Sequence, residues 1–256
     1  MTSLNGKRIL ITRALHQSFE MAEKITKLDG VPITIPVQKI QKASAFSDQT
    51  TVNKLVSEAE WVIFTSANAV DYFVQNITKE CKNELYKKQI AVVGEKTKKK
   101  VQEYGFSVTF MPEKYTGQSL ASELGKLLKS RTNLLFVKGS LASDRVHSIL
   151  SQLGHSVKEL TVYETVPNRE SRQQLMEILR TNGVDILTFL NPYSLEQFYE
   201  LVENQIDLKK LNEYKIACIG EVTVEKAKQL GLLHILFPTV YTVEALLLEI
   251  INQSYQ

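Results

Sequence analysis

Short apolar runs alternate along the chain with longer segments whose apolar residues recur at helical spacing. The run RILITR at residues 8–13 has the apolar and β-branched content of a buried strand. The segment at 18–30 repeats apolar side chains every three or four residues and ends at Gly30, which is typical of an amphipathic helix. The same alternation to the C-terminus predicts βαβ crossovers and parallel sheets, that is, an α/β fold. Further strands are expected at residues 31–37, 61–66, 89–94, 107–112, 133–139 and 156–164, and further helices from about residue 68 and at 95–105, 117–128 and 143–154, with the same order repeated from about residue 172.

The second half of the chain repeats the first half. The segment IAVVGEKT at residues 90–97 returns as IACIGEVT at residues 216–223. Aligning residues 90–124 with residues 216–250 gives twelve identities in thirty-five positions, where ordinary residue usage would give roughly two or three. The offset is 126 residues (216 − 90), whereas solenoid repeats recur every 20 to 50 residues or so. The repeat therefore predicts two similar, domain-sized units.

Composition is that of a globular protein. A chain of 256 residues with 43% apolar side chains can fill a core in each of two units. The two cysteines, Cys81 and Cys218, lie far apart without a C-x-x-C pair, so we expect neither a disulfide nor a zinc site. The N-terminus lacks a signal-peptide pattern and no apolar run approaches a membrane span, so a cytoplasmic protein without membrane association is expected. A net charge of +3, with lysines spread among acids, does not favour nucleic-acid binding and is compatible with an anionic small molecule.

The residues that follow the predicted strands are rich in Gly, Ser, Thr and Asn and poor in acids. Ligands of parallel α/β sheets bind at these carboxyl ends, where helix N-termini present free backbone N–H groups. Such residues suit the binding of carboxylates, although Ser, Thr and Asn are also expected there simply as helix N-caps. The positions are Arg13, TSAN (65–68), GEKT (94–97), KGS (138–140), LNPYS (190–194) and GEVT (220–223).

Several common sites are missing from the sequence. It contains no G-x-G-x-x-G, no G-x-x-x-x-G-K-[ST] and no G-x-S-x-G, so dinucleotide, P-loop and α/β-hydrolase functions lack their motifs. The four histidines are scattered without metal-ligand spacing, so no metal site is expected. The basic run EKTKKK at 95–100 is best interpreted as a solvated helix face, because no aromatic residues are interleaved with it.

Taken together, these segments resemble the uroporphyrinogen-III synthase family. The resemblance rests on VIFTSANAV, IAVVGEKT, LLFVKG with LGHSVKELTVYET, TFLNPYS, IACIGEVT and PTVYTVEALLLEI, which follow the family's order from about Arg8 to Ile250. Each motif alone is weak, but their order and the VYET element in mid-chain make the match fairly specific. One departure is Asn191 in LNPYS, where the family more often has serine. A hydroxyl-specific role at this position is therefore in doubt, whereas a hydrogen-bonding role is not.

The resemblance implies two flavodoxin-like domains that are interlocked in sequence. The first strand–helix–strand unit joins the C-terminal part of the chain, so residues 1–36 and 168–256 would form one domain and residues 37–167 the other. Two crossings, PVQKI and VYETVP, would then form a two-segment hinge that allows closure over a ligand. The duplicated GEKT and GEVT turns would line the two walls of the resulting cleft.

The implied reaction converts linear hydroxymethylbilane into uroporphyrinogen III with loss of water and inversion of ring D, so the enzyme would be a hydro-lyase of heme biosynthesis. It needs no cofactor or metal, and a monomer is implied. The main task would be to hold a flexible octa-acid in the cyclising conformation. Tyr163 of VYET is expected to be the catalytic general acid, the alternative being a tyrosine that only packs the crossing between the domains. The expected substrate-binding residues are Ser66, Asn68, Thr97, Gly139, Ser140, Asn191 and Thr223, with Arg13 and Lys138 added as charge contacts.

Two other classes of function remain open at this point. One is a hinged two-domain protein that binds an anionic metabolite without catalysis, whose extracytoplasmic members would need a signal peptide. The other is a nucleotide-sugar transferase of paired α/β domains, which usually needs a longer chain and a diphosphate-binding cluster. Incubation with hydroxymethylbilane, with resolution of the product isomers, would separate all three.

Overall fold

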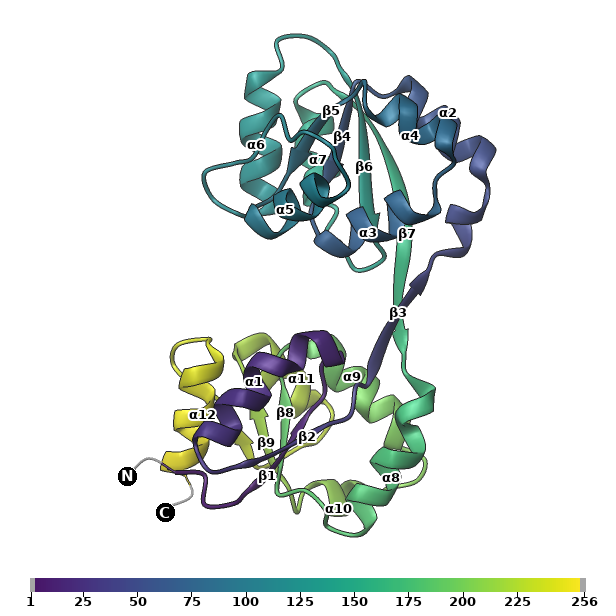
Figure 1. The fold of residues 1–256 in the computed structure, drawn as a ribbon. Helices are drawn as coiled ribbons and strands as arrows, with labels where there is room; N and C mark the ends of the chain where they lie inside the picture. The colour runs from purple at the N-terminus through teal and green to yellow at the C-terminus, as the bar shows by residue number, and fades with distance from the viewer. Residues whose placement is uncertain (1–2, 254–256) are drawn as a thin grey trace. The chain divides into compact units, whose positions relative to one another are not determined.

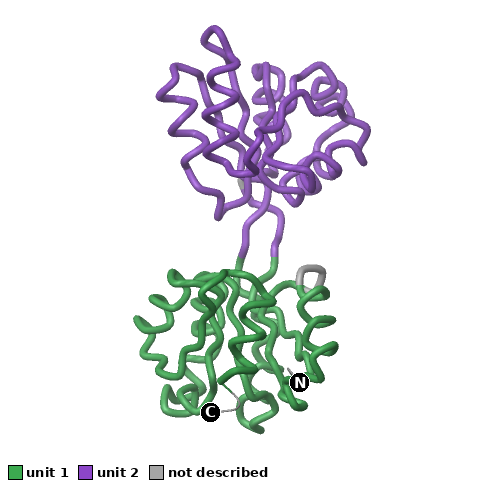
Figure 2. The backbone as a smooth tube through the Cα atoms, turned by 90° about the vertical axis from the view of Figure 1, so that its left-hand side faces the viewer, with its two compact units in different colours: residues 1–39, 166–256 green, residues 40–165 purple. Residues whose placement is uncertain are grey.

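The computed structural model describes residues 3–253, apart from the side chains of residues 15–17 and 45. It contains two compact units (Figure 2). Unit 1 comprises residues 1–39 and 166–256, and unit 2 comprises residues 40–165. Each unit holds one five-stranded sheet dominated by parallel strand pairs, with helices packed on both of its faces (Figure 1). The predicted α/β class with parallel sheets is therefore confirmed.

Unit 1 is a doubly wound sheet with the strand order β10-β9-β8-β1-β2. Its strands are β1 (Arg8–Ile11), β2 (Val31–Thr34), β8 (Ile186–Phe189), β9 (Lys215–Cys218) and β10 (Ile235–Leu236). Its helices are α1 (Leu15–Lys27), the 3-10 helix η2 (Arg169–Ser171), α8 (Arg172–Arg180), α9 (Pro192–Val202), α10 (Leu208–Leu211), α11 (Glu221–Gln229) and α12 (Val243–Asn252). Successive residues of β1 serve different cores, because side chains alternate along a strand. Ile9 and Ile11 pack with α1 and α12, whereas Leu10 packs with α8, α9 and α11.

Unit 2 has the strand order β3-β7-β6-β4-β5. Its strands are β3 (Gln38–Lys42), β4 (Trp61–Phe64), β5 (Gln89–Val92), β6 (Asn133–Gly139) and β7 (Ser156–Pro167), of which β3 and β7 both run across the boundary between the units. Its helices are the 3-10 helix η1 (Ser44–Ser47), α2 (Gln49–Glu58), α3 (Ala67–Asn76), α4 (Lys79–Leu85), α5 (Glu95–Glu103), α6 (Gly117–Leu127) and α7 (Arg145–Gln152). One core lies under α2 to α5 and contains Phe64 and Phe73, and the other lies under α6 and α7 and contains Phe136.

The internal repeat corresponds to matching helix pairs in the two units. Helices α3 and α5 of unit 2 are joined by an ion pair between Asp71 and Lys100 at 3.5 Å. Helices α9 and α11 of unit 1 are joined by an ion pair between Glu196 and Lys226 at 2.6 Å. Lys100 is the one lysine of the EKTKKK run that recurs in the second half, as Lys226, and its charge is used within the fold.

One expected strand forms only in part. The segment at 107–112 makes a single parallel bridge, between Phe110 and Ala91 of β5, instead of a continuous strand. Its backbone bonds to β5 include Thr109 N–H to the carbonyl of Ile90 at 2.8 Å. The segment lies at the edge of the sheet, where proline is tolerated and pairing commonly stops, and it ends in Pro112, two residues after the bridge. The counterpart in unit 1, β10, is only two residues long.

Candidate active site

The predicted site residues lie near the carboxyl ends of the strands, divided between the two units. In unit 1, Arg13 follows β1 and is partly buried. The other two of this unit follow β8 and β9, and they are Asn191 and Thr223. In unit 2 the set comprises Ser66, Asn68, Thr97, Lys138, Gly139, Ser140 and Tyr163. The structure thus brings seven of the ten predicted residues into one unit.

Ser66 and Asn191 are helix N-caps. The Ser66 hydroxyl accepts a hydrogen bond from the backbone N–H of Ala69 at 3.1 Å, at the start of α3. The Asn191 side-chain carbonyl accepts from the N–H of Ser194 at 2.7 Å, at the start of α9. Capping is therefore a real role of both residues, and asparagine can take it in place of serine because either side chain supplies an oxygen.

Thr97 and Thr223 do not cap their helices. The N-cap positions of α5 and α11 are taken by Gly94 and Gly220, and neither glycine has a side chain to offer. Both threonines are the third helical residue, with only 3% of each exposed. Their interpretation as N-caps is wrong, because each helix starts three residues earlier than a cap at these positions would require. Backbone N–H groups in the first turn of a helix lack the usual partner four residues earlier in the helix; in α11, the N–H of Thr223 donates to the carbonyl of Gly220 at 3.0 Å.

A tyrosine ring covers each of these N-cap glycines. A Cβ atom at Gly94 would lie 3.0 Å from Cγ of Tyr115, and a Cβ atom at Gly220 would lie 3.2 Å from Cγ of Tyr241. The rings are nevertheless 58% and 53% exposed. The two turns therefore share their local packing as well as their sequence, and a side chain at either glycine would require the neighbouring ring to shift by a few tenths of an ångström or so.

Lys138 is buried and already paired. Its Nζ lies 2.8 Å from a carboxylate oxygen of Glu159 and 3.3 Å from one of Asp144. Burial alone would lower the pKa of Lys138, but the bonds to Glu159 and Asp144 outweigh it, so the pKa is raised. The ammonium group is therefore charged and is held by two carboxylates within unit 2.

Tyr163 lies in β7 beside three other predicted residues. Its hydroxyl is 3.3 Å from the hydroxyl of Ser66. Its backbone carbonyl accepts a hydrogen bond from the N–H of Ser140 at 2.9 Å. The Ser140 hydroxyl in turn accepts from the N–H of Thr165 at 3.1 Å, so Ser140 holds β7 at the tyrosine and two residues beyond it. Gly139 is its neighbour on β6. Only the fold brings these groups together, since Ser66 and Tyr163 are 97 residues apart.

A cavity of about 520 Å³ lies near the carboxyl ends of β4 and β6 in unit 2. Its polar lining includes Thr65, Gln118, Ser143 and Arg145, and it contains no acidic side chain. Gln118 and Arg145 belong to the first turns of α6 and α7. Neither residue is among the site residues predicted from the sequence, although a position in the first turn of a helix behind a parallel strand is a signal that could have found them.

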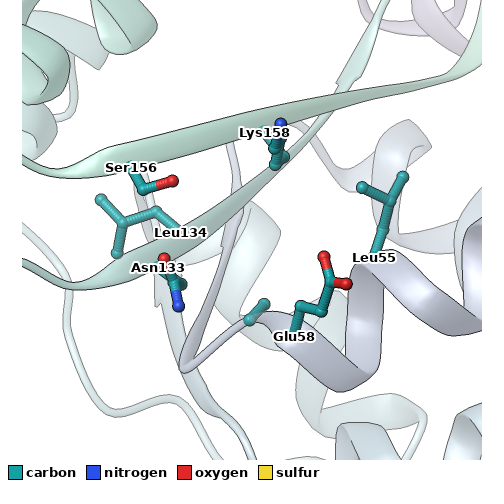
Figure 3. Close-up of a pocket in the computed structure, with 7 residues that line it drawn as sticks. Leu55, Glu58, Asn133, Leu134, Ser156 and Lys158 are labelled. Atoms are coloured by element: carbon teal, nitrogen blue, oxygen red, sulfur yellow. The ribbon is translucent and has the colours of Figure 1, made fainter.

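A smaller pocket lies at the opposite end of the same sheet (Figure 3). Its volume is about 130 Å³, and its lining includes Asn133 and Ser156, which are the first residues of β6 and β7, together with Glu58 and Lys158. Its position at the amino ends of the strands is not where parallel α/β sheets bind their ligands. The larger cavity is therefore the better candidate for part of a ligand site.

Neither a membrane-spanning helix nor a metal-binding cluster occurs among the described residues. Between residues 3 and 253, no helix combines the length and apolar character needed to cross a membrane. Over the same range, no group of three or more His, Cys, Asp or Glu side chains is arranged to hold a metal ion.

Comparison with known proteins identifies the family. The family model described as Uroporphyrinogen-III synthase HemD matches residues 20–247. The chain is 25% identical over 231 residues to the uroporphyrinogen-III synthase of Chlorobaculum parvum, covering 88% of this chain and 90% of that protein. It is 26% identical over 243 residues to a putative uroporphyrinogen-III synthase of Methanocaldococcus jannaschii, covering 94% and 96% of the two.

Solved structures show the same fold. A uroporphyrinogen-III synthetase from Helicobacter pylori is similar with a TM-score of 0.61 and 17% identity, over 98% of this chain and 99% of that chain. A mutant uroporphyrinogen-III synthase from Thermus thermophilus is similar with a TM-score of 0.57 and 20% identity, over 97% of each chain. The family model covers well over half of the sequence. The chain therefore belongs to the uroporphyrinogen-III synthase family, which acts in porphyrin biosynthesis.

Proposed function

We propose that this protein, as a hydro-lyase, cyclises hydroxymethylbilane to uroporphyrinogen III with loss of water and inversion of ring D. The observation that carries the proposal is the family match over residues 20–247. In this reaction the terminal hydroxyl leaves as water, the substituted carbon of ring D attacks the resulting azafulvene, and the spiro intermediate fragments and closes again with the ring reversed. The substrate itself supplies the electron pair that expels the hydroxyl, so the protein must mainly position the substrate and assist departure.

Tyr163 is the proposed general acid. Its phenol O–H is a hydrogen-bond donor, so it can give its proton to the departing hydroxyl. The hydroxyl of Ser66, at 3.3 Å, supports this role because it can accept from or donate to the phenol as the proton moves. Positioned general acids typically contribute 10² to 10⁴ or so in rate. We expect about tenfold here, because the pyrrole nitrogen already expels the hydroxyl.

The carboxylates of the substrate are proposed to bind at the helix N-termini. The turns at Thr97 and Thr223 would contribute backbone N–H groups, since their side chains are buried. The first turn of α3 would contribute Asn68, and the start of α9 would contribute Asn191. The remaining proposed contacts are Arg13, Lys138, Gly139 and Ser140.

The 520 Å³ cavity of unit 2 is a further proposed place for one acetate or propionate side chain of the substrate. Its lining includes Arg145, Thr65 and Ser143, residue types whose side chains can donate to a carboxylate, and no acidic residue that would repel one. We propose that no cofactor or metal takes part, that the protein acts as a monomer, and that it works in the cytoplasm.

The decisive experiment is incubation of the purified protein with hydroxymethylbilane, followed by chromatographic resolution of the product isomers. Enzymatic ring inversion yields the type III isomer, whereas unaided cyclisation yields the non-inverted type I isomer. A product that is type I throughout, at the rate of the protein-free control, would overturn the synthase function and leave the two alternatives, a binding protein without catalysis and a nucleotide-sugar transferase. Both alternatives are weaker, because the matched relatives are synthases.

The proposed role of the duplicated turns has its own test. Thr97→Val and Thr223→Val remove one buried hydroxyl each and keep the shape of the side chain. If the turns bind through backbone N–H groups, both variants should keep most of their turnover per folded molecule. A loss of a hundredfold or so in either would mean that the hydroxyl itself holds the substrate.

A further inference from the structure

The ladder between β6 and β7 contains an irregularity at Tyr163. Lys138 pairs with Thr161, but the next residue of β6, Gly139, pairs with Tyr163, so the register shifts by one residue. A bulge of this kind re-aims the side chains that follow it. Here it sets Tyr163 directly opposite a residue that has no side chain.

The ring of Tyr163 occupies the space that a side chain at Gly139 would need. A Cβ atom there would lie 2.2 Å from Cζ, 2.5 Å from Cε2 and 2.6 Å from the hydroxyl oxygen of the tyrosine. Non-bonded carbons are in contact at about 3.5 to 4.0 Å, so the two groups cannot coexist in this arrangement. The φ angle of Gly139 lies outside the left-handed region. The backbone would therefore accept alanine, and the tyrosine ring is the obstacle.

A second aromatic residue holds the ring from α3. The ring centroids of Tyr72 and Tyr163 are 5.5 Å apart with an interplanar angle of 37°, which is within the range of favourable aromatic pairs. The Tyr72 hydroxyl donates to the backbone carbonyl of Ile40 in β3 at 3.0 Å. Burial raises the pKa of Tyr72, so this phenol stays a hydrogen-bond donor at neutral pH. Tyr72 is thus fixed at both its ring and its hydroxyl.

We propose that Gly139 and Tyr72 are positioning residues for Tyr163. The missing side chain at Gly139 lets the tyrosine ring lie across β6, and the Tyr72 ring keeps it there, so that the phenol is held beside Ser66. This inference rests on the proposed function of Tyr163 as the general acid. It changes the expected role of Gly139, which acts through Tyr163 and does not need to touch the substrate.

Gly139→Ala is the first test. Displacing the phenol should lower kcat by about the same factor as Tyr163→Phe, about tenfold, with KM changed by less than about threefold. In the Tyr163→Phe background the alanine should cost nothing more, because the acid is already gone. The matched control is Gly125→Ala in α6, where the new Cβ atom would lie 2.3 Å from Cδ1 of Leu153. This variant introduces similar crowding in the same unit, away from Tyr163, and should keep wild-type kcat.

The position of the ring can be followed without an activity assay. With 3-fluorotyrosine in place of the ten tyrosines, the fluorine resonance missing from Tyr163→Phe identifies Tyr163. That resonance should move in Gly139→Ala and stay in place in Gly125→Ala. Tyr72→Leu removes the second ring without adding bulk, so it should also move the resonance and lower kcat. If Gly139→Ala does not fold, Tyr72→Leu still tests whether the position of the Tyr163 ring sets kcat.

The outcomes separate this inference from the proposed function. If Tyr163→Phe is impaired while Gly139→Ala and Tyr72→Leu keep wild-type kcat and an unmoved resonance, the positioning roles are overturned and the acid role stands. If Tyr163→Phe itself turns over at the wild-type rate, the acid role is overturned instead.

Discussion

Ser66→Ala should separate a structural hydrogen bond from a catalytic one, because this hydroxyl makes both. It accepts from the N–H of Ala69 at 3.1 Å as the cap of α3, and it lies 3.3 Å from the Tyr163 hydroxyl. Thr78 is a matched control in the same unit, since it caps α4 by accepting from the N–H of Cys81 at 3.2 Å. Thr78 has no part in the proposed site. Alanine at either position removes one cap, and only alanine at Ser66 also removes the partner of the phenol.

The expected sizes follow from the two bonds. Loss of an N-cap costs about 1 kcal/mol of unfolding free energy, within a range of about 0.5 to 2, so the two variants should be destabilised by similar amounts. The bond to the phenol has a net value of about 0.5 to 1.5 kcal/mol. If it orients the acid in the transition state, kcat of Ser66→Ala should fall by about two- to tenfold.

Denaturant titration of each variant gives the unfolding free energy, and turnover to the type III isomer gives kcat per folded molecule. Ser66→Thr keeps a hydroxyl and should restore most of both quantities. If Ser66→Ala and Thr78→Ala show equal kcat per folded molecule, the bond to Tyr163 has no catalytic value and the reasoning fails.

Two further predictions concern stability and access. The fork between Arg8 and Asp185, with N–O distances of 2.7 and 3.1 Å, holds together segments 177 residues apart, and Arg8 lowers the pKa of Asp185. Asp185→Asn should therefore destabilise unit 1 at pH 7, by about 1 kcal/mol or less because the side chains are 40% and 35% exposed. Because the pKa of Asp185 is lower in the folded than in the unfolded state, its carboxylate stabilises the fold at pH values above the unfolded pKa near 4. This stabilisation is lost as the pH falls through the folded pKa. The deficit measured by denaturant titration should shrink below about pH 4, and a deficit unchanged at pH 3 would contradict the pairing. Burial raises the pKa of Cys81 to about 11 and that of Cys218 to about 12, so neither thiol should react with a disulfide reagent at pH 8 until its unit opens. Each single serine variant keeps one thiol, so labelling of Cys81→Ser would report the opening of unit 1 and labelling of Cys218→Ser the opening of unit 2. Immediate labelling of either variant would show that the remaining thiol is not fully buried.

Much of the candidate site could be predicted because it depends on local pattern. A strand that is buried on both faces reads as a continuous apolar run, and the helix that follows must begin at its carboxyl end, which located the turns at Ser66, Asn191 and Thr223. The duplicated segment likewise predicted two units before any strand order was known. The hinge function of the two crossings stays a prediction. Local pattern could not predict which residue is the N-cap of each helix. In α5 and α11 the N-cap is a glycine, Gly94 or Gly220, although a threonine three residues later is a more usual capping residue type.

The sequence by itself determined the α/β class, the duplication, the family and the strand ends at which chemistry is expected. Only the tertiary structure decided which of those residues meet. The register shift that sets Gly139 against Tyr163, and the packing of Tyr72 on the same ring, depend on pairing between strands and helices that are distant in sequence. Periodicity specifies which face of an element is buried, but it does not specify the register of one strand against another. Nor does it specify which residue occupies the space beside a glycine. Those contacts are settled by packing across the whole unit, because a close-packed interior leaves one ring and one glycine only one way to fit together.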